Sequence, residues 1–141
     1  EALVMNFPYG ILVNRKGRRF TDEAPGPVDV NYDHISRDIK DQPDGIAWCV
    51  FDARMDDVPN WKKSIRTDLP PISAGSVAEL AHACGIATEG LEKTLCEYNA
   101  ACVQGAFKAL EVDALATVGL EPAKSNWARP IDKAPYYAYP I

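Results

Sequence analysis

Residues 10–23 read GILVNRKGRRFTDE. The first five of them, with Ile11, Leu12 and Val13 in succession, predict a short strand. Residues 14–17 have the composition of a turn, with Gly17 where a left-handed backbone conformation is needed. Residues 18–21 then return as a partner strand. This stretch therefore predicts a β-hairpin near the start of the sequence.

The segment after the hairpin predicts a loop and then a helix. Residues 23–27 read EAPGP, and two prolines with a glycine cannot continue a strand ladder. Tyr32, Ile35 and Ile39 follow at helical spacings of three and four, which indicates a helix from about residue 29 to residue 42. We expect Asp29 or Asn31 to cap that helix.

The rest of the chain alternates strand and helix signals before it becomes irregular. Residues 46–51 are continuously apolar, as in a buried central strand. Residues 76–79 match a capping box for a helix that ends at Gly85, and a second helix is expected from about residue 88. Residues 105–133 show no sustained period, and residues 136–140 look extended. Strands first and helices later predict an α+β fold.

Composition and charge restrict the class of protein. The chain has 141 residues, 47% hydrophobic and 25% charged, which fits one globular domain. The net charge of −5 lacks the basic footprint of a nucleic-acid binder, and we read the basic cluster at residues 15–19 as a solvated turn rather than an anion site. No apolar run has the roughly 18–20 residues that cross a bilayer, so we expect no transmembrane segment.

The cysteines and the terminus suggest where the protein resides. The four cysteines have no CxxC spacing, which argues against a zinc or dithiol site, and we expect them to be buried reduced thiols. The N-terminus does not resemble a signal peptide. A cytoplasmic location is therefore expected. Because the sequence opens on Glu1 and stops at a strand-like segment, we expect residues 1–141 to be a fragment of a larger chain.

Most catalytic motifs are missing from the sequence. None of the nine glycines falls in a GxGxxG or GxxxxGK[ST] pattern, so no phosphate-binding loop is expected. His34 and His82 form no HExxH motif, and a triad of His34 with a cysteine and an aspartate has little support. The neighbouring Asp56 and Asp57 are better explained as a solvated loop than as paired catalytic acids.

Three features retain possible chemistry: the arginines of the hairpin, the helix carrying Tyr32, His34 and Arg37, and the polar tail at residues 125–132. Arginine binds a carboxylate bidentately with a charge that is fixed at any working pH. Each helical residue also has a plainer reading. Arg37 would form a surface pair with Asp38, His34 would face solvent, and Tyr32 would belong to the core.

Four segments resemble the fumarate reductase/succinate dehydrogenase flavoprotein superfamily. Residues 9–23 are similar to its GxxVNxxGxRFxxE hairpin, which opens the cap domain inserted into the FAD-binding domain. Residues 46–52 are similar to the strand after the first helix of the cap, and residues 91–102 to its xxTVxxYNxxC helix. Residues 119–139 are similar to the tricarballylate dehydrogenase branch. In sequence order these segments cover nearly the whole chain.

The resemblance implies that residues 1–141 are a single α+β cap domain whose FAD-binding domain lies outside the sequence. It implies an FAD-dependent oxidoreductase whose cap traps a small di- or tricarboxylate between domains. In this branch the enzyme would oxidise tricarballylate to aconitate, with hydride transfer to flavin N5. The partners implied are the chain's own FAD-binding domain, the polycarboxylate substrate and an electron acceptor. By itself the fragment would hold no FAD and would be inactive.

The resemblance also supplies candidate site residues. Arg37-Asp38 reproduces the Arg-Asp pair of the catalytic arginine, so Arg37 is the catalytic candidate, with Tyr32 and His34 as substrate-binding residues. Two departures accompany this assignment. Aligned backwards from the following strand, the arginine falls nearer Asn31 or Tyr32, and the family's Glu-x-x-Arg element has Glu1 but Val4 in place of its arginine.

Two other readings remain open at the level of sequence. The chain could be a free-standing, non-enzymatic α+β module that binds a partner protein or a small acid. It could also be a member of the same superfamily that acts on fumarate, urocanate or a ketosteroid.

Overall fold

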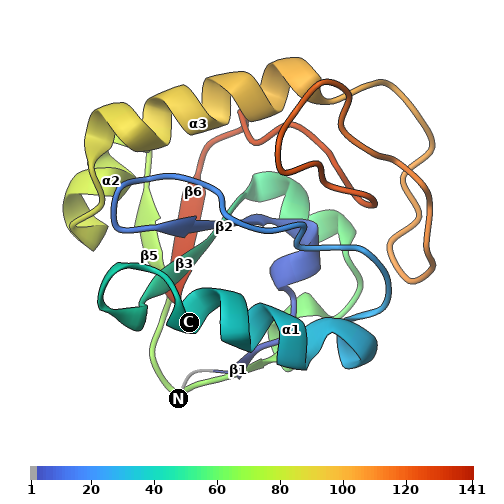
Figure 1. The fold of residues 1–141 in the computed structure, drawn as a ribbon, viewed down its shortest axis with the longest axis horizontal. Coiled ribbons are helices and arrows are strands. Elements are labelled where there is room, and N and C mark those ends of the chain that lie inside the picture. The colour runs from blue at the N-terminus through green and yellow to red at the C-terminus, as the bar shows by residue number, and fades with distance from the viewer. Residues whose placement is uncertain (1–2) are drawn as a thin grey trace.

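The computed structural model describes residues 3–141, and a four-stranded antiparallel sheet lies at the centre of this part of the chain (Figure 1). The strands are β2 (Ile11–Asn14), β3 (Ala47–Asp52), β5 (Ile72–Ala74) and β6 (Tyr136–Pro140). Their spatial order is β2-β3-β6-β5, so the last strand in sequence lies inside the sheet. The predicted strands at residues 10–14, 46–51 and 136–140 are confirmed, while β5 had no clear signal in the sequence.

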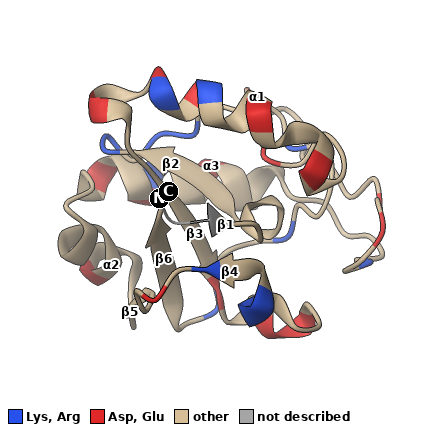
Figure 2. Ribbon diagram, turned by 90° about the horizontal axis from the view of Figure 1, so that it is seen from below, with Lys and Arg blue, Asp and Glu red and all other residues tan. Residues whose placement is uncertain are grey.

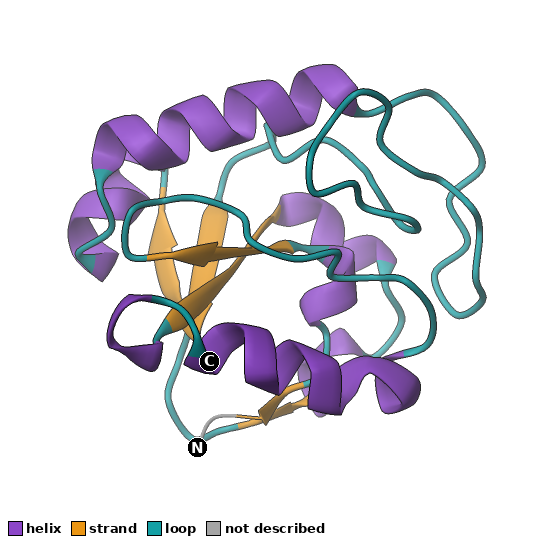
Figure 3. Cartoon of the chain, in the orientation of Figure 1, coloured by secondary structure: helices purple, strands orange, loops and turns teal. Residues whose placement is uncertain are grey.

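Both faces of the sheet are buried, which explains why its strands read as continuous apolar runs. Ile11, Val13 and Val50 point to one face and pack with α2 (Val77–Cys84) and α3 (Thr88–Ala101). Leu12, Cys49 and Phe51 alternate with them and pack on the other face, toward α1 (Val28–Lys40). Figure 3 shows the resulting layers, with α3 on one side of the sheet and α1 on the other.

The helices begin and end close to the predicted positions. Ser76 caps α2 by accepting a hydrogen bond from the amide of Glu79 at 3.2 Å, and Gly85 ends that helix with φ of 71°. The cap of α1 differs from the prediction, because Pro27 is the N-cap residue and no side chain caps the helix. The side-chain amide of Asn31 instead donates back to the carbonyl of Pro27 at 3.0 Å.

The hairpin is shorter than predicted. The turn is present, since the amide of Gly17 donates to the carbonyl of Asn14 at 2.9 Å, and Gly17 has φ of 74°. Its return segment is not a strand and keeps a single bridge, between Val13 and Arg19. The main partner of β2 is β3, with which it pairs antiparallel over four residues.

Smaller elements complete the description. The two-stranded ladder β1–β4 pairs Leu3–Val4 with Ile65–Arg66. Short 3-10 turns lie at Phe7–Tyr9, Pro43–Gly45, Ala53–Asp57 and Trp61–Ser64. Within residues 3–141, no helix has both the length and the apolar character that a membrane crossing needs.

The segment between α3 and β6 is irregular, as predicted, but side chains hold it in place. A carboxylate oxygen of Asp113 accepts hydrogen bonds from the amides of Leu115 and Trp127, each at 3.0 Å. Asn126 accepts from the amide of Ala114 at 2.8 Å and donates to the carbonyl of Ala24. These bonds satisfy backbone groups that a strand ladder would otherwise pair.

Candidate functional site

The arginine and glutamate of the hairpin motif form a buried ion pair. Arg19 and Glu23 are joined by two hydrogen bonds of 2.7 and 2.9 Å, and their side chains are 4% and 0% exposed. Glu23 also accepts from the amide of Leu12, and Arg19 donates to the carbonyl of Pro122. Burial alone would lower the pKa of Arg19, but the bonded carboxylate more than offsets this and raises it. The pair fixes the fold and is closed to a ligand.

A buried lysine ties the tail to the N-terminal segment. The ammonium of Lys124 donates to the carbonyl of Gly10 at 2.7 Å and to the carbonyl of Pro8. Its side chain is fully enclosed, and burial lowers its pKa to about 8, with Glu23 acting in the opposite direction. No local pattern predicts this role of Lys124, because it depends on contacts with residues more than a hundred positions away.

The polar tail at residues 125–132, a predicted functional feature, is engaged in internal contacts. Ser125 donates to Asp22, which joins the tail to the end of the hairpin. Arg129 forms an ion pair with Asp57 at 2.7 Å and lies over the ring of Phe107, 3.6 Å from its centroid. Since its guanidinium is already paired in this way, the tail contributes to structure rather than offering an open cation.

The three predicted site residues lie on α1 but not on one face. At 3.6 residues per turn, Tyr32 and Arg37 are about 140° apart around the helix axis. Tyr32 is half-buried beside the core on the inner face of α1. His34 and Arg37 are exposed, about 60° apart on the outer face. Figure 2 shows residues of both signs of charge along α1.

Arg37 and His34 differ in their partners. Among residues 3–141, the Arg37 guanidinium makes no ion pair, so the plainer reading that pairs it with Asp38 is wrong in this structure. Asp38 instead contacts Nε2 of His34 at 3.2 Å and accepts a hydrogen bond from the hydroxyl of Thr21 at 2.7 Å. The imidazole is thus oriented, and the guanidinium is available to an external anion.

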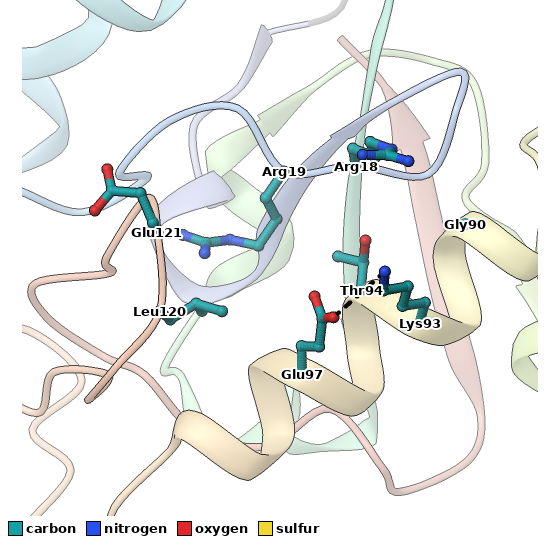
Figure 4. Close-up of a pocket in the computed structure, with 8 residues that line it drawn as sticks. All are labelled: Arg18, Arg19, Gly90, Lys93, Thr94, Glu97, Leu120 and Glu121. Atoms are coloured by element: carbon teal, nitrogen blue, oxygen red, sulfur yellow. Dashed lines mark ion pairs between the residues drawn. The ribbon is translucent and has the colours of Figure 1, made fainter.

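Two hollows border candidate features, one at the hairpin arginines and one at Tyr32, and neither is lined by His34 or Arg37. One, of about 170 Å³, is bordered by charged groups of the hairpin and of α3; Figure 4 shows Arg18, Lys93 and Glu97 at its edge. Nζ of Lys93 lies 3.8 Å from Oε1 of Glu97, so the charges at the edge of this hollow partly compensate each other. The other, of about 290 Å³, lies between Tyr32 and the end of β6. Its lining is Phe7, Tyr32, Ile35, Ser36, Ile39, Lys40, Gly45 and Ile141.

The cysteines follow the predicted burial only in part. Cys49 is buried, and burial raises its pKa to about 12; Cys84 and Cys102 are half-buried. Cys96 is exposed on α3, contrary to the prediction, because it points away from the stripe formed by Leu91, Leu95 and Tyr98. In residues 3–141 no cluster of three or more potential metal ligands is found.

In the part of the chain that the structure describes, the sheet does not have the form of a dinucleotide-binding fold. The sheet pairs its strands antiparallel, and no strand leads through a glycine-rich turn into a helix as dinucleotide binding requires. Glu1, the first residue of the family's Glu-x-x-Arg element, lies outside the described residues.

Comparison with known proteins gives a structural answer only. Neither a protein-family model nor a curated protein sequence matches the chain. Among solved structures, the open conformation of a flavocytochrome c3 fumarate reductase superposes with a TM-score of 0.64 and 22% identity over 97% of the chain. The 3-ketosteroid-delta4-(5alpha)-dehydrogenase of Rhodococcus jostii, in complex with 4-androstene-3,17-dione, superposes with a TM-score of 0.64 and 23% sequence identity over 98% of the chain.

A third structure is of similar size to this chain. It is the solution structure of a fumarate reductase flavoprotein subunit from Lactobacillus plantarum, with a TM-score of 0.60 and 20% identity, covering 97% of this chain and 85% of that one. The chain spans only 22% and 26% of the two larger proteins. At these identities the likeness establishes a common fold: the chain has the α+β fold of a domain found in fumarate reductase flavoproteins and in a ketosteroid dehydrogenase.

Proposed function

We propose that this chain is the substrate-capping domain of an FAD-dependent oxidoreductase that dehydrogenates or reduces a small di- or tricarboxylate, with tricarballylate to aconitate as the first candidate reaction. The observation that carries the proposal is the likeness to fumarate reductase and ketosteroid dehydrogenase structures over at least 97% of the chain. The tail similar to the tricarballylate dehydrogenase branch supports the choice of substrate. A cytoplasmic location and a separate electron acceptor belong to the same proposal.

In this proposal FAD is bound by another domain of a longer chain. The flavin would supply the hydride chemistry, and the residues of this chain would bind, orient and enclose the substrate. Arg37 is the catalytic candidate because its guanidinium is exposed and has no ion pair within residues 3–141. Closure against the flavin domain would remove water from Arg37 and strengthen its attraction for a carboxylate. His34, on the same outer face, would add a second contact, whereas Tyr32 lies on the inner face of α1 beside the core and would contact the substrate only from that side.

The test uses the full-length gene product, purified and assayed with tricarballylate and a dye acceptor. Arg37→Ala is expected to keep the flavin and lose activity by roughly a hundredfold or more, since a positioned cation at a reacting group contributes on this scale. The matched control is Lys93→Ala, an exposed cation on α3. A colourless full-length protein would contradict the proposal that the parent protein is an FAD-dependent enzyme. Normal turnover by Arg37→Ala would contradict the catalytic role of Arg37.

A second candidate is an apolar substrate such as a ketosteroid. Two observations favour it: a ketosteroid dehydrogenase is among the similar structures, and four of the eight residues that line the hollow beside Tyr32 are apolar, namely Phe7, Ile35, Ile39 and Ile141. Parallel assays with tricarballylate, fumarate, urocanate and 4-androstene-3,17-dione decide between the candidates. Flavin reduction by the steroid but by none of the acids would replace the first candidate with the second.

A non-enzymatic module is the remaining alternative. In that case the reading frame would end near Ile141, and the purified protein would be colourless and inactive with every one of these compounds.

A further inference from the structure

We propose that the hollow between α1 and the end of β6 is a binding site for a carboxylic acid with an extended apolar chain, and that the carboxylate of this ligand pairs with Lys40. The site goes beyond the proposed function, because tricarballylate carries three carboxylates and has no apolar chain. The lining, the charge and the dimensions of the hollow all point to this class of ligand, whichever reaction the parent protein catalyses.

The α1 wall of the hollow consists of two neighbouring rows of side chains. Tyr32, Ser36 and Lys40 follow one another at intervals of four residues, and Ile35 and Ile39 form a second row beside them. Residues four apart lie one above the other on a helix, so both rows run along the axis of α1. The hollow therefore has a polar border that ends in a cation, next to an apolar strip.

Segments distant in sequence form the opposite wall. Phe7, which is fully buried, lies in the 3-10 turn before β2, and Ile141 follows β6. The amide of Ile141 donates to the carbonyl of Ala47 at 3.0 Å, which holds this residue against β3. Figure 1 shows the end of β6 near the end of α1. Both walls are fixed by the fold, as is usual for small-molecule sites, which are largely formed before the ligand binds.

The charge at the border favours an anionic ligand. Lys40 is exposed and forms no ion pair within residues 3–141. Two acidic residues near it in sequence have other partners, since Asp44 pairs with Arg15 at 2.9 Å and Asp38 lies 3.2 Å from His34. An ammonium beside an apolar wall attracts a carboxylate more strongly than one surrounded by water, because the wall lowers the local dielectric constant. Lys40 is thus a free cation at the edge of an apolar space.

The dimensions restrict the ligand to a slender molecule. Tyr32 and Lys40 are eight residues apart, which corresponds to about 12 Å along a helix axis. An extended chain advances roughly 1.2 Å per bond, so about eight to ten carbons span this length. The volume of about 290 Å³ lies near the lower end of the range for small-molecule sites. Decanoate meets both conditions, with its carboxylate at Lys40 and its chain along Ile35 and Ile39.

The test is calorimetric titration of decanoate into the full-length protein. We expect saturable binding with a negative change in heat capacity, because apolar surface is buried. Each methylene added between hexanoate and decanoate should tighten Kd by roughly two- to fourfold, the range expected for a buried CH₂ group. Decylamine has the same chain and the opposite charge, and should bind about tenfold more weakly or worse, since it meets a like charge. Tricarballylate should not displace decanoate.

Two variants locate the site. Lys40→Gln removes the cation and should weaken decanoate binding by about tenfold or more, as for loss of a charged hydrogen-bond partner. Ser36→Leu places a larger side chain in the hollow and should abolish binding. The hydroxyl of Ser36 donates to the carbonyl of Tyr32 at 2.9 Å in an exposed position, so this variant should still fold, which circular dichroism checks. The matched control is Lys16→Gln, because Lys16 is an exposed cation of the hairpin turn that lines neither hollow.

Each outcome decides for or against the site. Lack of saturable decanoate binding to the folded wild type would overturn it. Equal affinity in wild type and Lys40→Gln, or undiminished binding by Ser36→Leu, would place the ligand elsewhere, and displacement by tricarballylate would replace the chain acid with a polycarboxylate. Since the titrations measure binding and not turnover, a protein that binds decanoate but oxidises no polycarboxylate would contradict only the proposed function.

Discussion

At the scale of single residues, the charged groups divide into buried ones that hold the fold and exposed ones that can act on a ligand. Arg19, Glu23 and Lys124 belong to the first group, since all three side chains are enclosed and bonded. His34 and Arg37 belong to the second. The most recognisable arginine of the sequence, in the hairpin motif, is thus structural, and a less prominent one on α1 is open.

The buried ion pair predicts a large loss of stability when its acid is removed. Glu23→Gln should lower the free energy of unfolding by about 3–5 kcal/mol, because it leaves the buried Arg19 guanidinium without its charge partner. Asp44→Asn is the matched control. It breaks the Arg15–Asp44 pair, whose side chains are 55% and 58% exposed, and should cost less than about 1 kcal/mol. Urea unfolding measures the free energy of unfolding of both variants, and an equal decrease in Glu23→Gln and Asp44→Asn would contradict the prediction.

Lys124 predicts a dependence of stability on pH. Burial lowers its pKa from 10.5 to about 8, so the folded state favours the neutral amine more than the unfolded state does. The folded state therefore has its full stability above the unfolded pKa of 10.5, where the amine is neutral in both states. This stability is lost as the pH falls toward about 8, because the unfolded chain then binds a proton that the folded state does not. Relative to Lys124→Met, the free energy of unfolding of the wild type should therefore rise between pH 8 and 10.5 and stay level below pH 7. If the difference in free energy of unfolding between wild type and Lys124→Met does not change with pH over this range, the prediction is wrong.

At the scale of elements, the turn of the hairpin packs directly on the start of α3. A Cβ added to Gly90 would lie 1.9 Å from the carbonyl oxygen of Lys16, and one added to Gly17 would lie 2.3 Å from the amide of Leu91. Two glycines, far apart in sequence, let the two backbones touch. This contact fixes the direction of α3 across the sheet.

Gly90→Ala tests this contact. Alanine favours a helix by about 1 kcal/mol over glycine, but the clash with a backbone oxygen should outweigh this and lower the free energy of unfolding by about 1–3 kcal/mol. Gly85→Ala is the comparison. Nothing lies within 4 Å of its added Cβ, so it carries only the cost of a left-handed backbone, about 1–2 kcal/mol. Thermal or urea unfolding decides, and a Gly90→Ala variant more stable than wild type would rule out the close contact.

The elements that could be predicted are those whose signal is local. The spacing of Tyr32, Ile35 and Ile39 located α1, and the capping box located α2. The order of strands, the pairing of β2 with β3 and the bond from Thr21 to Asp38 depend on groups distant in sequence, which no local pattern encodes. Of the candidate site, the residues on α1 could be named, but the division of α1 into an inner face with Tyr32 and an outer face with Arg37 follows only from the core.

At the scale of the whole molecule, the sheet depends on its last strand. β6 pairs with β3 over five residues and with β5 over three, so it joins the two parts of the sheet. Tyr139 and Ala138 of β6 are buried, one on each face. The two packed layers therefore meet at this strand.

A truncation measures this dependence. A chain that ends at Pro135 should fail to fold, because it loses the strand between β3 and β5 and exposes both of their edges. A chain that lacks only Ile141 should keep a dispersed amide spectrum with slightly lower stability. Amide chemical-shift dispersion in solution distinguishes the two, and a well-dispersed spectrum for the chain ending at Pro135 would show that the sheet closes without β6.

The position of β6 has a consequence for how the protein is made in the cell. Translation delivers β2, β3 and β5 before residues 136–140 exist, so the nascent polypeptide carries two unpaired strand edges until those residues leave the ribosome. A rare-codon pause placed just before codon 136 should lengthen this interval and increase aggregation, although the amino-acid sequence is unchanged.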